Sequence, residues 1–504
     1  MDTKALRQKI LDLAIRGKLV PQDPNDEPAS VLLERIRAEK QQMVKDGKLK
    51  PKDIKNDTVI FKDDDNLHYE KFSDGIVKCI EDEIPFDVPN NWEWVRIKTA
   101  CVINPRNSID DNTEVSFVPM ANIKEGYANK FISDIRVWKK VKKGYTHFAN
   151  NDIGIAKITP CFENKKSVVF SSLINGYGAG TTELYVLRTI SSLVIPEYLL
   201  NFVKRDDFIA GGVLTFSGDV GQQRVTKDYV ANYLFTLPPL NEQQRILNAV
   251  HTATSLIESI EKANDNLIRD IDKTKAKILD LAIRGKLVPQ DSNDEPASVL
   301  LERIRAEKEE LIKQGKIKRD KKESVIFKGD DNSYYQDLPE TWELVNFKDC
   351  ATLISGRDLN KNEYNAESIG IPYITGASNF INENILINRW TTVPKIVSEV
   401  NDILITCKGT VGELAINKYG NIHIARQIMA IRIYKNINLE YIKFFLESIV
   451  MEIKKTANGL IPGISRDDIL SLNIPLPPLA EQKRIVDEIE KIFATLDDIA
   501  NQVA

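Results

Sequence analysis

The chain has 504 residues, 42% hydrophobic and 28% charged, which is typical of a soluble protein of roughly two to four domains. It contains no apolar run of about 18 residues and no signal-peptide-like start, so we expect neither a membrane span nor export. The net charge of −4 argues mildly against a nucleic-acid binder that acts alone, and suggests that a partner supplies part of any such contact. The five cysteines are scattered without a CxxC pair, so we expect no disulfide framework, no zinc site and a cytoplasmic location.

One segment of the chain occurs twice almost unchanged. Residues 10–40 and 278–308 differ at one of 31 positions, where Pro24 in the first copy is Ser292 in the second. The stretches of about 90–236 and 340–475 resemble each other only faintly. A tandem duplication followed by even drift would not leave this contrast, so two constant interfaces and two variable readers explain it better. Shorter matches follow the long repeat: Val59–Lys62 with Val325–Lys328, Pro89–Glu93 with Pro339–Glu343, and Leu237–Ile246 with Leu476–Ile485.

The repeats divide the chain into alternating constant and variable segments. In chain order we expect an N-terminal helix (1–20), a repeated helix and linker (21–84), a first variable domain (85–240), a long central helix (241–285), a second repeated helix and linker (286–338), a second variable domain (339–478) and a C-terminal helix (479–504).

The repeated helices are predicted over 28–45 and 296–313, from apolar residues at helical spacing. Asp26 and Asp294 are the expected N-caps, each followed by an early proline, and Gly47 and Gly315 are the expected ends. Lysine-rich runs follow, at 48–55 and 313–322. We interpret them as solvated linkers, with phosphate contact as the alternative.

The central helix, predicted from Glu242 to Arg284, carries apolar residues at the heptad spacing of a coiled coil, with polar interruptions at Asn264 and Thr274. The two terminal helices carry parts of the same pattern. We therefore expect them to lie end to end and antiparallel to the central helix, in a circular organisation with a pseudo-two-fold axis; the alternative is two unrelated surface helices. The seam residues are Ile246, Val250, Ile257, Ile260, Leu267, Ile271 and Ile278 in the centre, Ile485, Ile489, Ile492, Leu496 and Ile499 at the C-terminus, and Leu6, Ile10 and Leu13 at the N-terminus.

Both variable domains contain short β-branched and aromatic runs separated by turns, which predict strands. Helices are expected over 197–210 and 439–456. The predicted fold class is therefore mixed α and β, with two α/β globules joined by long antiparallel coiled-coil segments. Glycines 176, 178 and 180 predict a tight turn rather than a nucleotide cradle.

This order of parts resembles the specificity subunits of type I restriction-modification systems. Each variable region ends in a Leu-Pro-Pro element followed by a Glu-Gln helix, at 237–246 and 475–485. The phrases at 152–164 and 402–412 also look like recognition-domain sequences of that family. No single motif is diagnostic, but the resemblance covers essentially the whole chain.

The resemblance implies that each variable domain is a target-recognition globule that reads one half of a bipartite double-stranded DNA site. It implies that the helices set the spacer and dock two methyltransferase subunits, which restriction subunits join. S-adenosylmethionine, ATP and Mg²⁺ would then belong to those partners, and this chain would hold no cofactor. The chain would be a non-catalytic part of a restriction endonuclease and adenine methyltransferase.

Base reading requires side chains such as Arg, Lys, Asn and Gln that reach groove edges. For each candidate the alternative is a solvated surface side chain, and Arg426-Gln427 interrupts an otherwise apolar predicted strand. Thr226 and Ser465 precede acidic residues, which favours helix capping over phosphate binding. The DNA-binding candidates are Lys157, Thr159, Asn164, Lys165, Lys166, Gln222, Gln223 and Arg224 in the first domain, and Lys408, Thr410, Arg426, Gln427 and Arg466 in the second.

We find no motif of an autonomous enzyme. There is no GxxxxGK[ST] loop, and Asn104-Pro-Arg-Asn107 lacks the aromatic residue that would stack on a flipped base. The histidines have no spaced partners, so no metal site is expected, and His251 is predicted to be exposed. Two alternatives remain: a coiled-coil scaffold without DNA contact, and an autonomous nuclease or methyltransferase.

Overall fold

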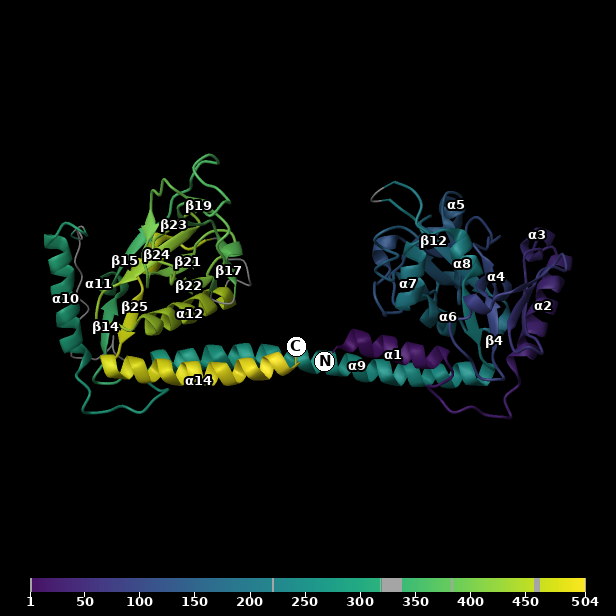
Figure 1. Cartoon of the computed structure of the whole chain (residues 1–504), viewed down its shortest axis with the longest axis horizontal. Coiled ribbons are helices and arrows are strands. Elements are labelled where there is room, and N and C mark those ends of the chain that lie inside the picture. The colour runs from purple at the N-terminus through teal and green to yellow at the C-terminus, as the bar shows by residue number, and fades with distance from the viewer. Residues whose placement is uncertain are drawn as a thin grey trace. The chain divides into compact units, whose positions relative to one another are not determined.

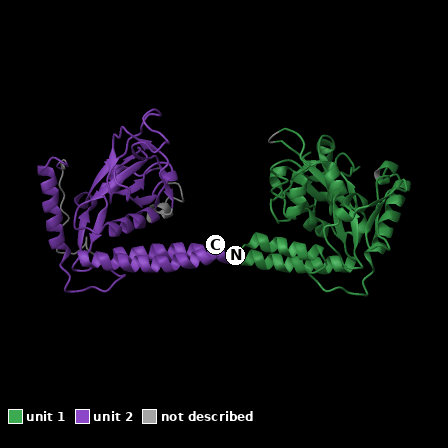
Figure 2. Ribbon diagram, viewed as in Figure 1, with its two compact units in different colours: residues 1–262 green, residues 263–504 purple. Residues whose placement is uncertain are grey.

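The computed structural model describes residues 2–219, 222–317, 319, 338–381, 384–456 and 463–503. The chain forms two compact units, residues 1–262 (unit 1) and 263–504 (unit 2) (Figure 2). The long helix α9 (Leu240–Ile283) contributes its first part to unit 1 and the rest to unit 2 (Figure 1). The fold is mixed α and β, as predicted.

The first variable domain contains two four-stranded sheets, in the orders β10-β9-β12-β5 and β7-β6-β11-β8. All paired strands are antiparallel except β6 and β11. The elements are α4 (Ile97–Ala100), β5 (Cys101–Ile103), β6 (Glu114–Val118), β7 (Asp134–Val137), α5 (Trp138–Val141), β8 (Thr146–Ala149), β9 (Ile153–Ala156), β10 (Ser167–Val169), β11 (Tyr177–Gly180), β12 (Leu184–Thr189), α6 (Pro196–Val203), α7 (Asp206–Val213) and α8 (Lys227–Asn232).

The second variable domain repeats this topology despite its faint sequence resemblance. Its main sheets have the orders β15-β24-β21-β22 and β19-β16-β23-β20, again with one parallel pair, β16 and β23. The elements are α11 (Phe347–Cys350), β15 (Ala351–Ser355), β16 (Ile371–Ile374), β17 (Phe380–Ile381), β18 (Asn384–Ile385), β19 (Trp390–Thr391), β20 (Val397–Ser398), β21 (Ile403–Thr406), β22 (Leu414–Ile416), β23 (Ile422–Ile424), β24 (Ile428–Ile433), α12 (Leu439–Thr456) and α13 (Arg466–Leu470).

Each variable domain enters and leaves through one antiparallel strand pair. In unit 1, β4 (Glu93–Arg96) pairs with β13 (Leu234–Leu237). In unit 2, β14 (Glu343–Asn346) pairs with β25 (Asn473–Leu476). The strand that closes each domain leads directly into a long helix through the Leu-Pro-Pro element.

The terminal helices pair antiparallel with α9 inside their own units. In unit 1, Arg7 of α1 (Thr3–Ile15) bonds Glu261 at 2.6 Å, while Ile15 shares a core with Ile246. In unit 2, the Asn264 amide donates to the Val503 carbonyl of α14 (Leu479–Val503) at 3.0 Å. Lys275 pairs with Asp497 at 2.5 Å further along the same helices. The expected meeting of the two terminal helices concerns separate units and stays a prediction.

The predicted seam is buried near the ends of α9 and more open in its middle. An ideal helix drifts relative to a strict heptad, and here the contact shifts from Thr274, which is exposed, to Lys275 and buried Leu279. Ile246, Val250, Ile257, Ile271, Ile485 and Ile489 are buried, Ile10, Leu13, Ile278, Ile492 and Leu496 are half-buried, and Leu6, Ile260, Leu267 and Ile499 are exposed. His251 is exposed, as predicted.

The repeated helices are α2 (Ala29–Lys45) and α10 (Ala297–Lys313), and both are followed by a glycine at positive φ, as predicted. The predicted N-caps are wrong. Proline occupies each N-cap without a side-chain hydrogen bond. The Asp26 carboxylate instead pairs with Arg245 of α9 at 2.6 Å, and Asp294 pairs with Arg484 of α14 at 2.6 Å. Each aspartate therefore bonds an arginine that is distant in sequence and does not cap the helix that follows it.

In the linker after α2 the lysines at 48, 50, 52 and 55 are exposed, as expected of a solvated run, but the linker also contains regular structure. It contains α3 (Pro51–Ile54) and a three-stranded sheet of β1 (Val59–Lys62), β2 (His68–Lys71) and β3 (Val77–Cys79). The second copy of the Val-Ile-Phe-Lys strand, and residues 318 and 320–322 of the second lysine run, lie outside the described residues.

Two local predictions differ from the structure. The helix expected over 197–210 divides at Lys204-Arg205 into α6 and α7, whereas α12 is continuous over its predicted range. Only Gly176 of the glycine cluster lies in a turn, and β11 follows it. Gly178 packs flat against Phe148, since a Cβ there would lie 2.1 Å from the ring.

Candidate nucleic-acid interface

Four of the first domain's candidates meet where β9 ends. The chain before α8 runs beside the chain after β9, because Val225 N donates to Lys157 O and Thr159 N donates to Gln223 O, both at 2.9 Å. Arg224 lies in the same ladder, so the structure brings Lys157, Thr159, Gln223 and Arg224 together. Gln222 is exposed beside them.

The charged groups of this cluster are held by neighbours. The Lys157 amine lies 5.4 Å from the Tyr185 ring centroid, within cation–π range. Arg224 donates two bonds to the Glu183 carboxylate, at 2.8 and 2.9 Å, and this bonding lowers the pKa of Glu183. The Thr159 hydroxyl donates to Glu163 at 2.6 Å. These contacts orient the side chains.

The three candidates in the next turn differ in access. Asn164 is exposed and Lys166 is half-buried. Lys165 is only 7% exposed, and its amine bonds the Tyr127 hydroxyl at 3.1 Å and the Asp206 carboxylate. This geometry gives Lys165 a structural contact and leaves its amine little access to DNA.

The second domain builds the equivalent place from other residues. Ile464 N donates to Cys407 O at 3.1 Å, and Cys407 N donates to Gln427 O at 2.8 Å. Lys408 and Thr410 are exposed after β21. Lys408 and Thr410 thus follow β21 as Lys157 and Thr159 follow β9 in unit 1.

Arg426 and Gln427 lie in the turn before β24, so they do not interrupt a strand as predicted. Both side chains are exposed, and Arg426 pairs with Asp358 at 2.8 Å. Arg466 is also exposed, and it donates to the Leu353 carbonyl at 2.6 Å.

The predicted caps are confirmed in both domains. The Thr226 hydroxyl accepts from Tyr229 N at 3.3 Å at the start of α8. The Ser465 hydroxyl accepts from Asp468 N at 3.2 Å at the start of α13. The capping function accounts for this aligned pair without a phosphate ligand.

A buried carboxylate ties each variable domain to its helix. Glu242 accepts from the Trp92 indole at 2.9 Å and from Gln22 at 2.5 Å. Glu481 accepts in the same way from Trp342 at 2.9 Å and from Gln290 at 2.6 Å. Burial raises the pKa of both carboxyls. The junction therefore joins the domain, the helix and the long repeat at one point.

The glutamine that follows each of these glutamates is also buried. Gln243 accepts from Ile195 N at 2.8 Å and donates to Pro238 O at 3.0 Å. Gln482 accepts from Asn438 N at 2.8 Å and donates to Pro477 O at 2.9 Å. These contacts explain the Glu-Gln element. Sequence reasoning did not assign a role to the tryptophans, although both recur in the Pro-x-x-Trp-Glu match.

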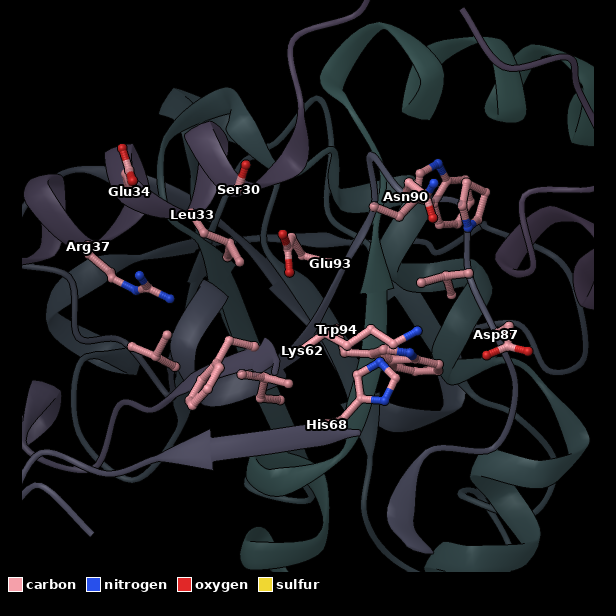
Figure 3. Close-up of a pocket in the computed structure, with 16 residues that line it drawn as sticks. Ser30, Leu33, Glu34, Arg37, Lys62, His68, Asp87, Asn90, Glu93 and Trp94 are labelled. Carbon is pink, nitrogen blue, oxygen red and sulfur yellow. The ribbon is translucent and has the colours of Figure 1, made fainter. Parts of the chain in front are cut away.

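A separate polar cavity of about 540 Å³ lies between α2, β1 and β4 in unit 1 (Figure 3). Its lining includes Arg37, Glu93 and Trp94, and none of the DNA-binding candidates. Burial raises the pKa of Glu93. With Glu34 and Asp87 also present, its carboxylates do not favour a phosphate backbone. The cavity is therefore not part of the candidate interface.

Within the described ranges, no group of His, Cys, Asp and Glu side chains could hold a metal ion. In the same part of the chain, no helix combines the length and apolar character needed to cross a membrane.

The fold consists of two variable domains of the same topology and paired helices, and comparison with known proteins identifies its class. The family model "Type I restriction modification DNA specificity domain" matches residues 89–269 and 339–503. The chain therefore belongs to the family of type I restriction-modification DNA specificity subunits. The scaffold alternative is not favoured.

Relatives match nearly the whole chain. The specificity subunit of the type I restriction enzyme EcoAI from Escherichia coli is 34% identical, over 98% of this chain and 90% of the relative. That of EcoEI, also from Escherichia coli, is 34% identical, over 99% and 90%. A chain from a structure on assembly and conformational transition of the type I restriction-modification system shares the fold, with a TM-score of 0.60, 21% identity, and coverage of 83% of this chain and 94% of that chain.

Proposed function

We propose that each variable domain reads one half of a bipartite double-stranded DNA site, and that α1, α9 and α14 set the spacer between the halves. One observation carries this proposal: two domains of the same topology place different polar side chains at the same junction of strand end and capped helix. A shared frame with different contact residues suits two readers of different sequences.

We also propose that these helices dock two methyltransferase subunits, which restriction subunits join in a complete complex. The exposed apolar residues in the middle of α9, including Ile260 and Leu267, support a protein partner on this helix. S-adenosylmethionine, ATP and Mg²⁺ then belong to those partners, and this chain performs no catalysis. A cytoplasmic location follows, since the DNA lies there.

The test is co-expression with the cognate methyltransferase subunit, followed by methylome sequencing. We expect methylated adenines in two short half-sites at a fixed spacing. A stable complex that leaves the genome unmodified would instead support a scaffold that does not read DNA. Methylation of a single continuous site would contradict the bipartite reading.

A further inference from the structure

The first variable domain has a helix break where the second has a continuous helix. Tyr198 and Tyr441 match, because each lies three residues after the backbone N–H that bonds Gln243 or Gln482, and each hydroxyl donates to a carbonyl of the closing strand. Lys204 therefore matches Glu447, which lies inside α12. A helix break leaves N–H and C=O groups without intrahelical partners.

Gln8 of α1 meets the polar groups at this break. The Asp206 N–H, at the start of α7, donates to the Gln8 side-chain oxygen at 3.0 Å. The Gln8 nitrogen donates to the Tyr127 hydroxyl at 2.7 Å, with the Lys204 carbonyl at a longer 3.5 Å. One amide of the helical support thus bonds two separate parts of the domain.

The same place is organised inside the domain by a buried amine. Lys204 is 2% exposed, and its amine donates to the carbonyls of Gly126 at 2.6 Å, Ala128 at 3.0 Å and Lys165 at 3.3 Å. Burial, with a smaller effect of the Lys165 cation, lowers the pKa of Lys204 to about 7. The loop that carries Tyr127 is therefore fixed on both sides of the residue that Gln8 contacts.

The other unit lacks this amide. The long repeat begins at residues 10 and 278, and two residues before it Gln8 is matched by Ala276. Ala276 lines a hollow with Ser448 and Met451 of the continuous α12. The methyl group of Ala276 makes no hydrogen bond. The continuous α12 needs no external hydrogen-bond partner at this place, because its backbone groups bond one another within the helix. Unit 1 thus has both the glutamine, just before the repeated sequence, and the helix break, whereas unit 2 has neither at the matched positions.

We propose that Gln8 is a positioning residue that seats the first variable domain on α1 and thereby narrows the range of half-site spacings that the complex accepts. This inference rests on the proposed function, in which the helices hold two half-site readers at a set distance. A domain held by one fewer contact samples more orientations, so it tolerates more spacings.

The test uses the full chain assembled with its methyltransferase subunits, and two variants. Gln8→Ala removes the amide and copies Ala276. Gln244→Ala is the matched control, because Gln244 is exposed on α9 and donates to Asn248 of the same helix. Binding is measured on DNA with the native spacer and with spacers one base pair longer or shorter.

For Gln8→Ala we expect the preference for the native spacer to fall roughly fivefold to tenfold, the effect of losing the hydrogen bonds of one half-buried amide, with both half-sites unchanged. Hydrogen exchange at 126–128 and 204–207 should become faster. Gln8→Glu keeps the acceptor for Asp206 N but loses the amide N–H donor and places a second carboxylate near Asp206, so an intermediate loss is expected. Gln244→Ala should behave as wild type in both measurements.

Two outcomes would overturn the proposal. One is a Gln8→Ala complex that keeps the wild-type spacer preference. The other is equal weakening on all targets, which would mean that Gln8 acts on folding alone. If the wild-type complex binds no bipartite DNA, the proposed function fails, and the exchange measurement still decides whether Gln8 seats the domain.

Discussion

At the residue scale, two buried tryptophans of unit 1 differ in whether the indole N–H has a hydrogen-bond partner. Trp92 and Trp94 lie two residues apart in the sequence, and each is 3% exposed. The Trp92 indole donates to Glu242, whereas the Trp94 indole nitrogen has no hydrogen-bond partner among the described residues. This pair allows the contribution of the junction to be separated from that of aromatic packing.

We expect Trp92→Phe to lower the free energy of unfolding by about 1–3 kcal/mol more than Trp94→Phe, because only the first change removes a donor from a buried carboxylate. Urea unfolding of the full chain measures the difference. Equal losses in the two variants would show that the indole–carboxylate bond contributes nothing beyond ring packing.

Lys157 and Lys408 both lie in the segment that follows corresponding strands, β9 and β21, so each serves as the other's control. We expect Lys157→Ala to weaken DNA binding by about 1–2 kcal/mol, roughly tenfold, through the first domain's half-site only. Fluorescence anisotropy with DNA in which one half-site is scrambled measures this. Lys408→Ala should show the reverse dependence. If both variants bind every target like wild type, these lysines do not contact DNA.

At the element scale, the helices were predicted well, because heptad spacing and capping residues are signals that lie within or next to the helix itself. The heptad pattern placed the central helix at 242–284, against Leu240–Ile283 in the structure. Thr226 and Ser465 were predicted correctly as caps. Asp26 was predicted wrongly because its partner, Arg245, is 219 residues away in sequence. The break at Lys204 depends on three carbonyls from two other segments, 126–128 and Lys165, which no local pattern reveals.

The ruler hypothesis belongs to α9. Inserting four helical residues beside Asn264 should lengthen the helix by about 6 Å and rotate its C-terminal part by about 40° relative to its N-terminal part. We expect a longer spacer in the recognised site, with both half-sites unchanged, as read by methylome sequencing. The same insertion in the linker at Gly47, outside the paired helices, is the control and should leave the spacer unchanged. Altered half-site bases would refute the ruler.

At the scale of the whole molecule, the division into constant and variable parts was predictable from the repeat, and the DNA contacts were not. The structure brings Lys157, Thr159, Gln223 and Arg224 together, yet it also encloses Lys165 beside Asp206. Sequence spacing alone could not separate these lysines, since access depends on how the turn folds over α7. All thirteen nominated contacts stay predictions.

Replacing residues 90–236 with the corresponding region of another family member should change one half-site and leave the other half-site intact. The physical reason is that Glu242 and Gln22 lie outside the exchanged region and can bond a tryptophan that the new domain carries at the position of Trp92. Methylome sequencing of the chimaera measures the outcome. A change in both half-sites would show that the domains do not read independently.

The paired strands at the base of each variable domain have a consequence for tolerance of length. In unit 1, Glu93 lies opposite Leu237, so the chain departs from the frame and returns to it on neighbouring strands, about 5 Å apart. Such a domain is topologically an insertion at one point. Residues added inside the domain can extend into solvent, and residues can be removed there without moving the strand pair. Neither change needs to displace the helices that pack against the pair. Inserts of unequal size can therefore be carried on the same strand pair without any change in the helices of that unit.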